Sequence, residues 1–116
     1  MAVKRMVLQL GMGTDIRGAD YTKAAVRALR DALWHNSLSV ADAVGLPVDA
    51  MQVEVTIGVQ HPDKVDAAAV KAVLPHGQVA VRVVKGGLDV PDEGSPDVAV
   101  IASAAVAVGM DLPQAK

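Results

Sequence analysis

The chain contains no cysteine and no phenylalanine, and it has one tryptophan and one tyrosine among 116 residues. The absence of cysteine excludes a disulfide framework, a thiolate nucleophile and a zinc–cysteine site, and it fits a reducing compartment. Because 52% of the residues are hydrophobic and almost none is aromatic, the core must be built from Ala, Val, Leu, Ile and Met. Such a core is thin, and it favours burial of a second surface by association.

The chain also lacks an excess of charge of one sign. Its formal net charge is −2, so no basic stripe can neutralise phosphates, which argues against binding to nucleic acid. The longest apolar run, Val98 to Met110, is too short and too rich in alanine to cross a membrane. Met1 to Arg5 do not have the architecture of a signal peptide. We therefore expect a cytoplasmic, single α/β domain (residues 1–116) with no membrane partner.

Alternating apolar residues predict the strands. Met6, Leu8 and Leu10 predict a first strand whose even-numbered side chains point into the core. Three further strands are predicted at Met51–Val59, Val79–Val83 and Val98–Val108. Ser103 interrupts the apolar pattern of the last strand, so this strand is a candidate for a break.

Two helices are predicted between these strands. Asp20 is placed to cap a helix from about Tyr21 to His35, and Pro62 opens a second helix that ends near Leu74. The order βαβαββ predicts an α/β two-layer sandwich, a four-stranded mixed sheet with two helices on one face. The opposite face is then expected to carry Arg5, Gln9, Gln52, Glu54, Thr56 and Arg82. Those side chains would be solvated or would line the inside of a closed oligomer.

The segment from Leu8 to Arg27 carries most of the unusual polar chemistry. An apolar strand is followed by a glycine-broken polar loop and then by a helix, an arrangement that can hold a small anion with backbone N–H groups and the helix N-terminus. The glycine spacing is not that of a dinucleotide fingerprint, and no P-loop lysine follows, so no cofactor is expected. An ordinary strand-to-helix turn is the alternative.

Several residues of this segment are candidates for a binding site. The candidate ligand-binding residues are Gly11, Gly13, Thr14, Asp20, Thr22, Lys23 and Arg27. Lys23 lies in the first helical turn, where a cation opposes the helix dipole unless an anion is bound there. Asp15 is a candidate catalytic base, and a local turn hydrogen bond is its alternative role.

The three histidines occur singly, without the paired spacing of a metal site, so no metal is expected. His61 follows the second strand at the edge of the sheet and is the candidate catalytic imidazole. His35 is favoured at a helix C-terminus by the dipole alone.

The combination GMGTDIRGADYTKAAVRA, HNSL, GVQHPDKVD, GGL and ASAAVAVG resembles a family of small conserved hypothetical proteins, the Lin family. The resemblance covers nearly the whole chain. That family carries no established activity, so the resemblance implies no reaction.

The pattern of Thr14-Asp15 followed by Asp20 to Lys23 more loosely resembles one repeat of the ring-opening amidohydrolases, the cyanuric acid hydrolase and barbiturase group. That resemblance implies a related fold and a threefold assembly. Gly11 and Gly13 stand at the positions where the family pattern has Ser and Lys, so the Ser-Lys chemistry does not carry over.

Together these features lead us to expect a homo-oligomer, a trimer, that holds a small polar or anionic metabolite near its subunit interfaces. As an enzyme it would use Asp15 or His61 to move protons and Lys23 or Arg27 to neutralise charge. As a non-catalytic ligand-binding or scaffold protein, its loop would only organise the oligomer. Convergence of Thr14, Asp15, Lys23 and His61 on one pocket favours the enzyme, and their dispersal with satisfied local hydrogen bonds favours the scaffold.

Overall fold

The computed structural model describes residues 3–34, 51–74 and 77–111. The elements, in chain order, are β1 (Val3–Asp15), α1 (Tyr21–Trp34), β2 (Gln52–Val59), the 3-10 helix η2 (Pro62–Lys64), α3 (Ala67–Lys71), β3 (Gln78–Lys85), β4 (Leu88–Pro91) and β5 (Val98–Asp111).

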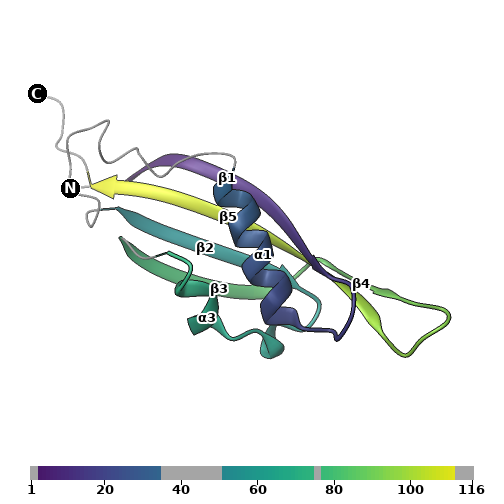
Figure 1. Cartoon of the computed structure of the whole chain (residues 1–116). Helices are drawn as coiled ribbons and strands as arrows, with labels where there is room; N and C mark the ends of the chain where they lie inside the picture. The colour runs from purple at the N-terminus through teal and green to yellow at the C-terminus, as the bar shows by residue number, and fades with distance from the viewer. Residues whose placement is uncertain (1–2, 35–50, 75–76, 112–116) are drawn as a thin grey trace, which may run out of the picture.

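The strands form one mixed sheet in the order β1-β5-β2-β3. β5 runs antiparallel to β1 and to β2, and β3 runs parallel to β2. Helix α1 lies across one face of this sheet, over β1, β5 and β2 (Figure 1). The predicted α/β class with a mixed sheet is confirmed, but the sheet has five strands because β4 also pairs with β5.

Strand β1 is longer than the sequence pattern predicts, because it continues through the two glycines to Asp15. A Cβ on Gly13 would overlap backbone atoms of Ala24 and Ala28, and one on Gly11 would overlap those of Ala28 and Ala32. The glycines therefore let α1 pack directly against the strand. The expected glycine-broken loop is wrong in this respect, and the connection to α1 comprises residues 16–20.

The side chains of β1 face the opposite way from the prediction. Leu8, Leu10 and Met12 are exposed on the face that α1 leaves open, and Leu10 is 67% exposed. Gln9 is 6% exposed and lies on the helix side. Alternation predicts which residues share a face, but here the close packing of α1 on the glycines decides which face is covered.

The other strands follow the expected alternation. Val53, Val55 and Ile57 of β2 are buried, as are Val100 and Val106 of β5. The core side chains are mainly Val and Ala, as the composition requires.

Most of the residues expected on the open face are found there. Gln9 is the exception, because its side chain is buried on the helix side. Gln52, Glu54, Thr56 and Arg82 alternate with inward-facing valines and isoleucine on β2 and β3. The side chain of Arg5 lies outside the described part of the structure.

Two other details of the prediction are corrected. Ser103 does not break β5; it is exposed on the open face, opposite Met12 of β1 and Gly58 of β2. The second helix is split into η2 and α3, and Asp66 caps α3 by accepting hydrogen bonds from the backbone N–H groups of Ala68 and Ala69. Because an N-cap residue has a non-helical backbone, the cap at Asp66 begins a separate helix and does not extend η2.

Within the described residues, no helix is both long enough and apolar enough to span a membrane. The predicted end of the first helix near His35 falls outside the described residues, as does His76, the third of the histidines.

Candidate functional site

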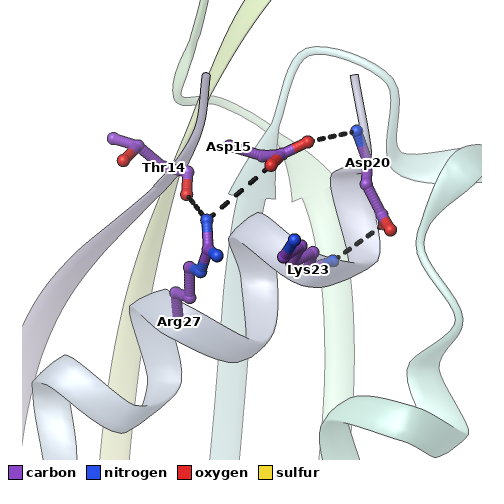
Figure 2. A network of polar contacts seen from close by, with 5 residues as sticks. All are labelled: Thr14, Asp15, Asp20, Lys23 and Arg27. Atoms are coloured by element: carbon purple, nitrogen blue, oxygen red, sulfur yellow. Dashed lines mark hydrogen bonds and ion pairs between the residues drawn. The ribbon is translucent and has the colours of Figure 1, made fainter. Parts of the chain in front are cut away.

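Asp15, at the end of β1, holds the short loop that leads into α1. Its carboxylate is buried, and Oδ2 accepts a hydrogen bond from the backbone N–H of Asp20 at 2.9 Å (Figure 2). Between them, Gly18 and Ala19 both have positive φ, 90° and 48°. Because an alanine rarely adopts this conformation, the hydrogen bond to Asp15 helps to fix a strained turn.

Arg27 reaches back from α1 to the same strand end. Its Nη1 donates to the carbonyl of Thr14 at 2.7 Å and lies 3.7 Å from Asp15 Oδ1. Asp20 caps the helix by accepting the backbone N–H of Lys23 at 2.9 Å (Figure 2). These backbone groups are therefore already bound to carboxylates or to Arg27, which matches the turn-stabilising alternative for Asp15.

Thr22 joins the start of α1 to the crossover that follows β2. Its hydroxyl accepts a hydrogen bond from the backbone N–H of Asp66 at 2.8 Å and donates one to the carbonyl of Lys64 at 3.4 Å. Lys23 is exposed, and its ammonium forms no ion pair with any residue in the described part of the chain. Thr22 is thus occupied structurally, whereas the Lys23 ammonium remains available to a ligand.

A second polar cluster lies beside the first residue of α1. The hydroxyl of Tyr21 donates to Asp89 Oδ2 at 2.5 Å, and His61 Nε2 lies 3.4 Å from the same oxygen. The rings of Tyr21 and His61 meet edge to face at 5.4 Å. Two side chains, one from α1 and one from the β2–η2 connection, therefore converge on a carboxylate from β4.

A glycine turn places Asp89 in this cluster. Gly87 has a φ of 60°, and a Cβ there would overlap the carbonyl of Ile101. The side-chain amide of Gln60 donates to the carbonyls of Gly86 and Gly87 at 3.1 and 3.2 Å. The turn thus brings β4 back alongside β5 directly after β3, with Asp89 next to His61.

The register of the sheet relates the two polar clusters. Val100 of β5 pairs with Asp15 on one side and with Asp89 on the other. Residues directly opposite each other across strands share a face, so both side chains lie on the helix side, from Cα positions about 10 Å apart. They flank the N-terminus of α1 from two sides.

The electrostatics of the second cluster depend on Tyr21. Burial, followed by the hydrogen bond to Asp89 and the charge of Asp89, raises the pKa of Tyr21 to about 12. The phenol is therefore a neutral donor at physiological pH. The ammonium of Lys64 lies 5.5 Å from the centroid of the Tyr21 ring, which is a cation–π contact.

The cluster is suited to proton transfer. The His61 side chain is 51% exposed, whereas that of Asp89 is 20% exposed. A carboxylate at Nε2 orients the imidazole, so Nδ1 can accept a proton from a bound molecule. Asp89 Oδ1 is buried without a hydrogen-bond partner among the described residues, which is uncommon for a buried polar atom in a native protein.

The predicted residues thus separate into two neighbouring groups. Thr14, Asp15, Asp20 and Arg27 form the loop network, while His61 belongs to the cluster with Asp89. Gly11 and Gly13 lie beneath α1. Because they have no side chains, the helix backbone can pack directly against them. Their assignment to ligand binding, like that of the other candidates, stays a prediction.

Sequence reasoning did not identify Tyr21 or Asp89 as site residues. Tyr21 is the chain's one tyrosine and directly follows the cap residue, a signal that could have been used. Asp89 gives no local signal, because its proximity to His61 depends on the glycine turn and on pairing with β5. Within the described residues, no group of three or more histidine, aspartate or glutamate side chains could hold a metal ion.

The fold and the site define a small two-layer α/β protein with its polar residues gathered at the N-terminus of one helix. The sequence model of a family described as conserved hypothetical protein, the Lin0512 family, matches residues 5–108. The chain therefore belongs to this family, as its sequence motifs predicted.

Several solved chains match this chain, and one of them is similar over almost its whole length. It is described as an FtsZ-like protein of unknown function from Nostoc punctiforme PCC 73102. The two chains are 38% identical, the match covers 97% of this chain and 99% of that chain, and the TM-score is 0.87. No curated protein matches the chain.

Proposed function

We propose that the protein is a homo-oligomer that binds a small polar or anionic metabolite beside the N-terminus of α1, with His61 as the proton-accepting group. The observation that carries this proposal is the shared carboxylate of Asp89, which is mostly buried and contacts both the Tyr21 hydroxyl and the half-exposed imidazole.

The proposed chemistry is acid–base catalysis on the bound molecule. His61 Nδ1 takes a proton from a hydroxyl or an acidic C–H group, and Asp89 stabilises the resulting imidazolium. Tyr21, neutral because of its raised pKa, keeps Asp89 in place through its hydrogen bond. Asp15, the other predicted catalytic residue, supports the turn in this proposal.

The charges around the cluster are of both signs, because Asp89 and Asp63 are carboxylates that act on Tyr21, and two lysines offer positive charge to an anionic group on the ligand. Lys64 lies over the Tyr21 ring, and Lys23 extends from the first turn of α1 without an ion-pair partner in the described structure. A carboxylate or phosphate held by these ammonium groups would also be favoured by the helix dipole. The backbone N–H groups of Asp20 and Lys23 contribute less, because they already donate to carboxylates.

Association through the open face of the sheet is supported by its side chains. Leu8, Leu10 and Met12 are exposed on β1, and Leu88 is exposed on β4. We propose a trimer in which these apolar side chains of β1 and β4 make the contacts between subunits, while the polar side chains of β2 and β3 line a central channel that small molecules enter. We place the protein in the cytoplasm, in keeping with the lack of cysteine.

The loop network favours a second candidate function. Asp15, Thr14 and Asp20 are all engaged in local hydrogen bonds, which is what a scaffold or non-catalytic ligand-binding protein would show. In that case the protein would bind its ligand without proton transfer.

Ligand-observed NMR on a defined mixture of small carboxylates, phosphates and amides tests binding. The wild-type protein is expected to broaden the signals of at least one compound, and His61→Gln and Asp89→Asn are expected to weaken that binding by about tenfold or more. The matched control is Glu93→Gln, because Glu93 is an exposed carboxylate between β4 and β5 with no hydrogen bond or ion pair in the described structure. Equal binding by all four proteins would contradict the proposed site.

Consumption of the bound compound distinguishes the two functions. An enzyme is expected to convert it at a rate that His61→Gln lowers, whereas a scaffold leaves it unchanged.

A further inference from the structure

A hollow lies between β2 and β3 on the open face of the sheet, on the opposite side from α1. Its volume is about 190 Å³, and it is lined by Glu54, Val55, Thr56, Ala80, Val81 and Arg82. By strand alternation, four of these residues have side chains on the open face, and the two valines contribute from the strands themselves.

The small size of Ala80 creates the space. Glu54 pairs with Ala80 on β3 and with Ala107 on β5, so its carboxylate stands between two alanines. One rung further along, Thr56 pairs with Arg82 and with Ala105. The hollow is therefore bordered by a carboxylate, a hydroxyl and a guanidinium above an alanine floor.

The two charges in this hollow are not paired. Glu54 and Arg82 are diagonal neighbours on adjacent strands, a separation that long side chains can bridge, yet they form no ion pair with each other or with another described residue. Both side chains are exposed and free to contact a bound molecule.

We infer that this hollow is a second binding site, for a small zwitterion of the α-amino acid class. Arg82 offers a two-pronged hydrogen-bond donor for a carboxylate, Glu54 accepts from an ammonium group, and Thr56 lies between them. The volume is below the 300–1,000 Å³ or so of drug-sized sites, which limits the ligand to a few heavy atoms. A neighbouring hollow of about 410 Å³ shares Glu54 and Ala80 and extends to Lys71, so a polar side chain on the ligand has room.

Isothermal titration with glycine, alanine, serine, aspartate and glutamate tests this inference. At least one of them is expected to bind, and its N-acetyl and carboxamide derivatives are expected not to bind, because each derivative lacks one of the two charges. Arg82→Gln and Glu54→Gln should each weaken binding by about tenfold or more, and Ala80→Leu should fill the hollow and abolish binding.

Two control variants show whether binding depends on this hollow in particular. Arg30→Gln removes an exposed cation from α1 and should leave the affinity unchanged, as should His61→Gln, which affects only the site proposed above. Melting curves identify any variant that fails to fold. The inference is overturned if none of the five amino acids binds, if the blocked derivatives bind equally well, or if folded Arg82→Gln and Glu54→Gln proteins both bind like the wild type.

Discussion

At the scale of single residues, Asp89 determines how the second cluster works. Its Oδ2 accepts the Tyr21 hydroxyl and faces the His61 imidazole, while its Oδ1 is buried without a partner among the described residues. Removing the Asp89 carboxylate would therefore lower the pKa of Tyr21 and change the orientation of the His61 imidazole. Asp15 differs, because its contacts hold a turn together.

Tyr21 gives a direct measure of this environment. Because it is the single tyrosine of the chain, its ionisation can be followed by the ultraviolet absorbance of tyrosinate. The expected midpoint in the folded protein is about 12. Asp89→Asn should move it part of the way towards 10, since burial, the largest cause of the shift, remains. A wild-type midpoint near 10 would show that Tyr21 is neither buried nor bound to Asp89.

The raised pKa of Tyr21 makes the free energy of unfolding depend on pH. A raised folded-state pKa means that the folded protein holds the phenol proton more tightly than the unfolded chain does. This contribution is complete below about pH 10 and is lost as the pH rises to about 12.

The sequence predicts single site residues unevenly. His61, Asp15 and Arg27 are recognisable because their residue types and their positions at the ends of elements suggest chemistry. Asp89 is not recognisable, since only the positive φ of Gly87 and the pairing of β4 with β5 bring it to His61.

At the scale of elements, the packing of α1 on β1 depends on two missing side chains. Gly11 and Gly13 lie under Ala28 and Ala32 of the helix, so backbone packs against backbone with almost no side chain between. The periodicity of the sequence predicted both elements, but it assigned the even-numbered residues of β1 to the core. A period of two cannot decide which face a helix covers when the covered positions are glycines.

Gly13→Ala tests this packing. The added methyl group would overlap the backbone of Ala24 and Ala28, so the helix must move and the free energy of unfolding is expected to fall by about 3 kcal/mol. The matched control is Gly94→Ala, where the nearest atom to the new Cβ is Asp92 Oδ1 at 3.9 Å. Urea denaturation measures both variants, and equal stability of the two would refute the close packing.

At the scale of the whole molecule, one face of the sheet is covered by helices and the other is open. One is covered by α1 and the crossover segments, and the other presents leucines and methionine on β1 beside glutamate, threonine and arginine on β2 and β3. The low aromatic content predicted a thin core and a second buried surface. It could not indicate which surface, because that depends on the face chosen by α1.

Leu10→Lys is expected to dissociate the proposed oligomer. Leu10 is 67% exposed in the single chain, so the substitution should leave the fold intact while placing a charge in the interface. Sedimentation should give the wild type a mass of three times the 11.9 kDa chain and the variant the mass of a single chain. The control is Ile16→Lys, equally exposed but in the loop before α1. A wild-type protein that sediments as one chain would refute the assembly.

The most direct test of the proposed function is the NMR signal of the His61 imidazole during titration with the compound found by ligand-observed NMR. His61→Gln assigns that signal, and His35 and His76 serve as internal references. We predict that the His61 resonance shifts with ligand concentration, and that Asp89→Asn reduces the shift at equal concentration. If the compound binds while the His61 resonance stays in place, the ligand does not contact this cluster and the proposed function is wrong.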